Sequence, residues 1–170
     1  MNYFELFDIP VQLRVDKASL PRKFFELSRK YHPDFFVNGS AGEKMVALER
    51  SALLNKAFKT FQDHDATIKY VLQLKGLLEE EEKYELPPGF LMEVLEINEE
   101  LMELGDNKTQ VTDLEIRISQ LQEEIYEPVK EIVEGYKEDL TSEKELLQVK
   151  EYYYKKKCLD RIRQQLNGMA

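Results

Sequence analysis

The chain contains only two histidines, and one of them lies in a triplet that could take part in recognition. His32, Pro33 and Asp34 follow a basic amphipathic segment and precede a second apolar segment. Because Pro33 ends a helix and fixes the turn, it should hold the imidazole and the carboxylate on a rigid loop, where recognition groups are commonly found. The triplet therefore predicts a polar docking surface, although the same side chains could simply cap and end a helix.

Candidates for catalysis or metal binding are few. His32 and Asp34, together with His64, could act as an acid and a base or as metal ligands, but the chain has no H-x-x-x-H spacing. We interpret His64 as a residue in a turn at the end of a helix. The single cysteine, Cys158, can form neither an intramolecular disulfide nor a cysteine-based zinc cage. The sequence therefore predicts a protein with no catalytic residue, no metal and no cofactor, and an enzyme is the alternative.

The charge of the chain changes sign along its length. Residues 1–75 carry a net charge of +3 and residues 76–170 a net charge of −12, which together give the −9 of the whole chain. Two halves of opposite sign indicate two modules with different partners. The acidic half argues against a nucleic-acid ligand, and the small basic excess of the first half disfavours one there.

A glutamate run at 79–82, followed by Pro-Pro-Gly at 87–89, marks the boundary between the modules. Like charges repel and prolines cannot continue a helix, so this segment predicts a connector. We expect a first domain at 1–76, a linker at 77–87 and a second domain at 88–170. No run approaches the ~20 apolar residues of a membrane span. The first eight residues lack a basic n-region, which argues against a signal peptide and favours the cytoplasm.

Composition and periodicity predict an all-α protein, with few glycines and prolines and no strand pattern. In the first domain we predict helices over 2–8, from an Asp16 N-cap to Pro33, and over 42–62 and 65–75. Pro21 would then lose one backbone hydrogen bond. The second of these helices is amphipathic, with an apolar stripe at Leu20, Phe24, Leu27 and Tyr31 and an opposite basic face at Arg22, Lys23, Arg29 and Lys30. That face could be merely solvated.

The second domain should be a bundle of three helices, over 88–104, 109–138 and from Thr141 or Ser142 to 166, with a turn at 105–107 between the first two. The middle helix keeps a heptad register, which suits an antiparallel bundle, at Val111, Leu114, Ile118, Leu121, Ile125 and Ile132. Pro128 lies on this register and should kink or split the helix.

The first domain resembles a J domain. The resemblance is carried by Tyr3-Phe4-Glu5-Leu6-Phe7, the basic helix, the His32-Pro33-Asp34 signature and Asn55-Lys56-Ala57-Phe58. It implies a helical hairpin, with flanking short helices, that binds a DnaK-type chaperone through the signature and the four basic residues and stimulates its ATPase. Many J domains carry Lys after the aspartate, whereas Phe35 stands here, a departure expected to weaken the electrostatic contact.

In the second domain, residues 90–101 read FLMEVLEINEEL. This segment closely resembles the client-binding helix of HscB-type co-chaperones, which also directly follows a J domain. It implies an adaptor, not an enzyme, that brings an IscU-type iron–sulfur scaffold protein to a DnaK/HscA-type chaperone. The client-binding residues it implies are Leu91, Met92, Leu95, Glu96, Glu99, Glu103 and Tyr154.

Other interpretations of these residues stay open. By periodicity alone, Leu91, Met92 and Leu95 would be core residues, and only the resemblance places them outward. Residues 88–104 contain five glutamates and no Lys or Arg. An apolar ridge bordered by carboxylates suits a partner with an apolar spot and a basic rim. A generic J protein that serves another client is the alternative function.

Overall fold

The computed structural model describes residues 1–105 and 107–169, without the side chain of Met169. Over these residues the chain forms helices and loops and no strand, which confirms the all-α prediction. The chain divides into two compact units, Met1–Lys75 with Tyr136–Leu140, and the remainder. Asp106, in the predicted turn, and Ala170, at the end of the predicted second domain, lie outside the described residues.

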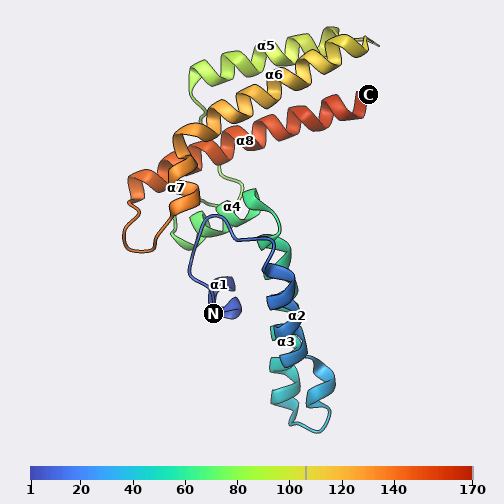
Figure 1. The fold of residues 1–170 in the computed structure, drawn as a ribbon, viewed down its shortest axis with the longest axis vertical. Helices are drawn as coiled ribbons and strands as arrows, with labels where there is room; N and C mark the ends of the chain where they lie inside the picture. The colour runs from blue at the N-terminus through green and yellow to red at the C-terminus, as the bar shows by residue number, and fades with distance from the viewer. Residues whose placement is uncertain (106, 170) are drawn as a thin grey trace. The chain divides into compact units, whose positions relative to one another are not determined.

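Unit 1 is a helical hairpin with short helices beside it. Its elements are α1 (Tyr3–Phe7), α2 (Leu20–Lys30), the 3-10 turn η1 (Pro33–Phe36), α3 (Ala41–Phe61) and α4 (His64–Leu74). The two hairpin helices, α2 and α3, lie side by side (Figure 1). The rings of Phe24 and Phe58 stack between them with centroids 4.1 Å apart, and the Ser51 hydroxyl donates to the Tyr31 carbonyl at 2.9 Å. These contacts hold the loop between the helices in place.

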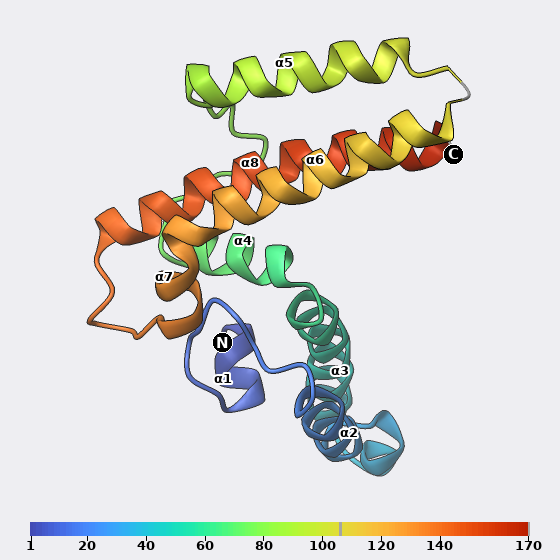
Figure 2. The same ribbon diagram turned by 45° about the horizontal axis from the view of Figure 1, so that its top comes forward.

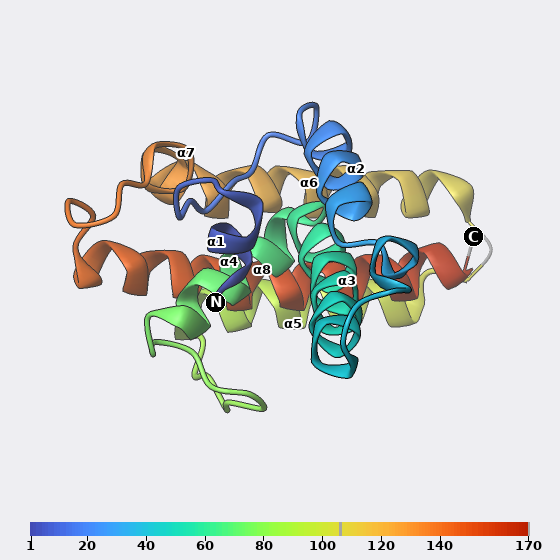
Figure 3. The same ribbon diagram turned by 90° about the horizontal axis from the view of Figure 1, so that it is seen from below.

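α1 lies beside α3 and α4 (Figure 3), and the core of unit 1 is aromatic where these helices meet. Phe4, Phe7 and Phe61 are at most 1% exposed. The ring of Tyr3 stacks on that of Tyr70 at 4.2 Å, and the Tyr70 hydroxyl accepts the Tyr3 backbone N–H at 2.9 Å. Such buried rings contribute most of the apolar area that this small unit removes from water.

The predicted start of α2 is wrong. The helix begins at Leu20, and its N-cap is Ser19, three residues after the predicted N-cap Asp16. The Asp16 carboxylate instead accepts the backbone N–H of Ala18 in a preceding turn. Pro21 thereby falls in the first helical turn, where backbone N–H groups have no partner inside the helix, so it costs no hydrogen bond.

Unit 2 contains three long helices whose axes run roughly side by side, as Figure 2 shows. Its elements are α5 (Pro88–Glu103), α6 (Lys108–Tyr126), the 3-10 turn η2 (Glu127–Val129), α7 (Lys130–Gly135) and α8 (Glu143–Met169). In Figure 2, α5 and α8 run in the same direction, and α6 runs in the opposite one. Ile97, Ile118 and Leu166, one from each of these helices, are fully buried. The predicted three-helix bundle is confirmed.

Two local features shape the bundle. Pro128 lies in η2 and separates α6 from α7, so it splits the predicted middle helix. A capping box opens α8: the Ser142 hydroxyl accepts the Glu145 N–H at 3.1 Å, and the Glu145 carboxylate accepts the Ser142 N–H at 3.0 Å. No described helix is both long enough and apolar enough to cross a membrane.

Candidate functional site

The loop with the signature triplet is exposed at the end of the α2–α3 hairpin. α2 ends at Lys30, two residues before His32, and Pro33 opens the 3-10 turn η1. The backbone N–H of Asp34 donates to Nδ1 of His32 at 3.2 Å. Side chains of His32 and Asp34 are 53% and 85% exposed. The loop is therefore ordered by its own hydrogen bonds while both polar groups face solvent.

The four basic residues of α2, here called the basic face, lie on the exposed side of the helix. Arg22, Arg29 and Lys30 are exposed, and Lys23 is half-buried. Arg22 pairs with Glu26 one turn on, at 3.6 Å, but both side chains stay well exposed. Such an exposed pair is weak, so the positive charge of this face stays available to a partner.

The predicted client-binding residues of α5 lie on the side of the helix that faces solvent. The helix begins at Pro88, a favoured first position, and its buried residues are Phe90, Val94, Ile97 and Leu101. Leu91, Met92 and Leu95, here called the α5 ridge, are 47%, 58% and 51% exposed. The core interpretation of the ridge is therefore wrong, because a different set of apolar side chains on the same helix fills the bundle.

The carboxylates near the ridge differ in their surroundings. Glu99 and Glu103 are exposed. Glu96 accepts a hydrogen bond from Arg117 of α6 at 2.9 Å, and the same guanidinium binds Glu100 at 2.6 Å. Arg117 thus neutralises part of the acidic rim from within the unit.

Tyr154 lies in a network that the sequence did not indicate. Its hydroxyl donates to Glu82 at 3.0 Å, and the Lys150 ammonium donates to the other oxygen of that carboxylate at 2.9 Å. The Tyr154 ring stacks on that of Tyr84 with centroids 4.6 Å apart. Burial and the Glu82 carboxylate raise the pKa of Tyr154, and the hydrogen bond from Lys150 lowers the pKa of Glu82.

These contacts attach the segment before α5 to α8. Leu78 is 5% exposed, and the Glu82 and Lys150 side chains are 23% and 12% exposed. One member of the predicted glutamate run therefore has a specific partner within unit 2. Only an aromatic residue in a run of charges, Tyr84, could have hinted at this packing from the sequence.

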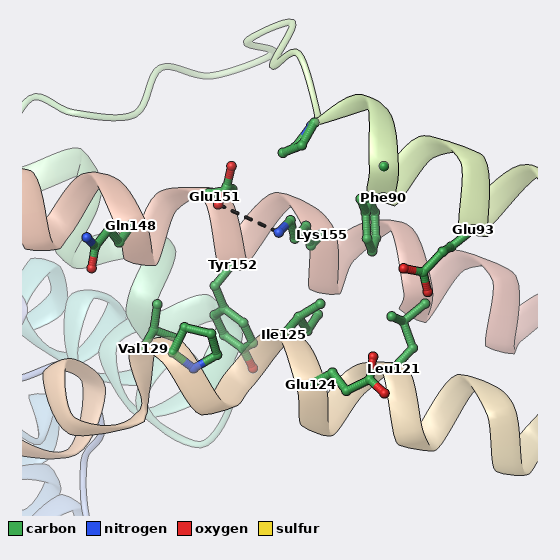
Figure 4. Close-up of a pocket in the computed structure, with 13 residues that line it drawn as sticks. Phe90, Glu93, Leu121, Glu124, Ile125, Val129, Gln148, Glu151, Tyr152 and Lys155 are labelled. Atoms are coloured by element: carbon green, nitrogen blue, oxygen red, sulfur yellow. Dashed lines mark ion pairs between the residues drawn. The ribbon is translucent and has the colours of Figure 1, made fainter.

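A groove of about 700 Å³ opens between α5, α6 and α8 (Figure 4). Phe90 and Glu93 line it from α5, and Leu121 from α6. The Lys155 ammonium lies 5.6 Å from the centre of the Phe90 ring and 3.6 Å from the Glu151 carboxylate. Among the described residues, the α5 ridge takes no part in this lining, so the ridge and the groove are separate surfaces.

Candidate metal ligands do not gather in the described part of the chain. No group of three His, Cys, Asp or Glu side chains there could hold a metal ion. His64 is the first residue of α4, with Asp63 as its N-cap, far in sequence from His32. Burial raises the pKa of the Cys158 thiol, which disfavours a reactive thiolate.

Comparison with known protein families gives one match for the second unit. Residues 86–167 match the family model described as the HSCB C-terminal oligomerisation domain. A curated protein of Vibrio cholerae serotype O1 (strain M66-2), the co-chaperone protein HscB homolog, is 38% identical over 102 residues. A second strain of the same serotype, O395, gives 37%. These matches cover 59% of this chain and 60% of the length of the curated relatives.

Two solved structures are similar over nearly the whole chain. The crystal structure of human co-chaperone protein HscB matches with a TM-score of 0.79 and 30% identity, and covers 98% of this chain and 81% of that one. The chaperone HscB from Vibrio cholerae matches with a TM-score of 0.74 and 25% identity, over 98% and 96% of the two chains. The similarity therefore includes both units.

Proposed function

The chain belongs to the HscB family of co-chaperones, and from this premise we propose that it is an adaptor between a DnaK/HscA-type ATPase chaperone and an IscU-type iron–sulfur scaffold protein. In this proposal the chain stimulates ATP hydrolysis by the chaperone and is not itself an enzyme. It needs no cofactor, binds neither nucleic acid nor membrane, and acts in the cytoplasm.

The chaperone would bind to unit 1. Its signature loop presents an imidazole and a carboxylate to solvent on a turn with little conformational freedom, and the basic face lies on the helix that leads into that loop. A cationic surface beside a rigid polar loop suits an acidic partner surface. We propose His32, Pro33, Asp34 and the basic face as this binding site.

The scaffold protein would bind to unit 2. The single observation that carries this part is the exposure of the α5 ridge beside exposed carboxylates. Isolated surface apolar residues are common, but a contiguous apolar patch with a polar rim is typical of an interaction site. We propose the ridge with Glu96, Glu99 and Glu103 as the client-binding surface, and Tyr154 as a further member.

One measurement tests the adaptor function directly. The ATPase rate of the chaperone is measured alone, with this chain, with scaffold protein, and with both. We expect stimulation by the chain and a larger stimulation with both. The variant His32→Gln, at an exposed turn, should keep its helicity and melting temperature but lose the stimulation. Retained stimulation by this variant would contradict the chaperone role, and normal stimulation without any scaffold binding would indicate another client.

A further inference from the structure

Two phenylalanines of unit 1 lie exposed among the proposed chaperone-binding residues. Phe25 of α2 is 63% exposed, and Phe35 of η1 is 70% exposed. Single exposed apolar residues are common on proteins and need no explanation by themselves. These two differ because each of them contacts a residue of the proposed binding site.

Phe25 lies next to residues of the basic face. It lies three positions after Arg22 and four before Arg29, so all three share one side of α2. The Arg29 guanidinium carbon lies 5.8 Å from the centre of the Phe25 ring, a cation–π distance. The neighbouring Phe24 stacks on Phe58 of α3 and serves the hairpin. Phe24 therefore packs within the hairpin, whereas Phe25 is exposed to solvent.

Phe35 belongs to the signature loop. Its ring meets that of His32 edge to face, with centroids 6.4 Å apart, and its backbone N–H donates to the His32 carbonyl at 3.1 Å. The 3-10 turn Pro33–Phe36 thus fixes the backbone from which this ring projects. An aromatic side chain on a fixed backbone loses little conformational entropy on binding.

We propose that Phe25 and Phe35 are apolar anchors of the chaperone-binding surface, which selects a partner patch that is acidic and also carries apolar spots. This inference rests on the proposed function and names the kind of chaperone surface that the same site binds. The basic face supplies the attraction to acidic groups, and the two rings supply apolar area at the places where contact is closest. Aromatic and Arg side chains are the usual residues of such interface centres.

Phe35 stands where many J domains carry a lysine, and the two side chains would contribute differently to binding. A lysine would add a charge whose contribution is screened by salt within ~8 Å at physiological ionic strength. A phenylalanine contributes by burial, which salt does not screen. Binding by this chain should therefore fall less steeply with salt than binding by its Phe35→Lys variant.

The test uses the full chain and the purified chaperone, with binding measured by calorimetry at several salt concentrations. Phe25→Ala and Phe35→Ala should each weaken binding at least tenfold without loss of helicity, whereas Phe35→Leu should bind nearly as the parent does. Phe35→Lys should give a steeper salt dependence. Met45→Ala is the matched control, since Met45 of α3 is similarly exposed, at 62%, and this variant should bind normally.

His32→Gln separates failure of this inference from failure of the proposed function. If His32→Gln abolishes ATPase stimulation while both alanine variants bind as tightly as the parent, the anchors are refuted and the adaptor function stands. If His32→Gln stimulates normally, the proposed function is refuted and the anchors with it. A loss in Met45→Ala equal to that of the two phenylalanine variants would also refute the anchors, because it would show a non-specific effect.

Discussion

Replacing the α5 ridge with alanine should separate stability from binding in unit 2. The side chains of Leu91, Met92 and Leu95 are about half exposed. Full burial of such a side chain is worth about 1.5–3 kcal/mol, so each half-buried one should contribute about 1 kcal/mol. The free energy of unfolding of the triple variant should therefore be about 3 kcal/mol lower than that of the parent, and the variant should remain folded at 25 °C. A fully buried residue such as Ile97 should cost about 2–5 kcal/mol alone.

Binding of the scaffold protein should respond far more strongly. If the ridge forms the centre of the interface, each truncation should cost about 2 kcal/mol, which is about a 30-fold loss in affinity. Chemical denaturation followed by calorimetric titration with scaffold protein measures both quantities on one sample. Ile116→Ala is the matched control, because Ile116 of α6 is 51% exposed and should leave both quantities nearly unchanged.

Two results would refute this reasoning. A folded triple variant that binds the scaffold protein as the parent does would show that the client binds elsewhere. An unfolded triple variant would show that the ridge stabilises the bundle by more than the ~3 kcal/mol expected from its half-exposed side chains. Binding would then be measured on the single variants.

Three further predictions follow from the described contacts. Arg117→Gln should release Glu96 and Glu100 and speed association with a basic client, seen by stopped-flow at low salt, with little loss of stability. Glu82→Gln should lower the free energy of unfolding by about 1–3 kcal/mol at pH 7, whereas Glu79→Gln, at an exposed position, should not. The folded state lowers the pKa of Glu82. The stabilisation by this carboxylate is therefore present above pH 4.5 and is lost as the pH falls through the folded pKa. Burial, with Lys17 and Arg14 nearby, lowers the pKa of His64 and outweighs Asp65 and Asp63, so melting temperatures should fall as the pH drops below 6.5, and less so in His64→Gln.

Much of the fold could be predicted because prolines, glycines and periodicity act locally. α3 and α5 lie within one residue of their predicted ends, since a Ser40 cap and a Pro-Pro pair start them. The start of α2 could not be decided locally. Asp16 has the chemistry of a cap, but Pro21 fits better in the first turn, and the helix therefore begins at Leu20.

The candidate sites were less predictable, because exposure depends on tertiary packing. Apolar residues of α5 occupy more than one side of the helix, and periodicity could not choose which side the bundle buries. The network around Tyr154 joins residues about 70 positions apart, and no local pattern announces a contact of that kind. For the ridge, the family resemblance supplied the orientation that residue spacing alone could not.

Unit 1 is not continuous in sequence, and this affects how the protein can be made. It includes Tyr136–Leu140 as well as the first 75 residues, and Glu138 accepts a hydrogen bond from Lys75 at 2.6 Å. The ribosome synthesises the chain from its N-terminus, and N-terminal domains generally fold first. Here the first unit can acquire its last segment only after α5, α6 and α7 have been synthesised. Unit 1 therefore cannot complete its folding before most of unit 2 has been synthesised, although each unit has its own core.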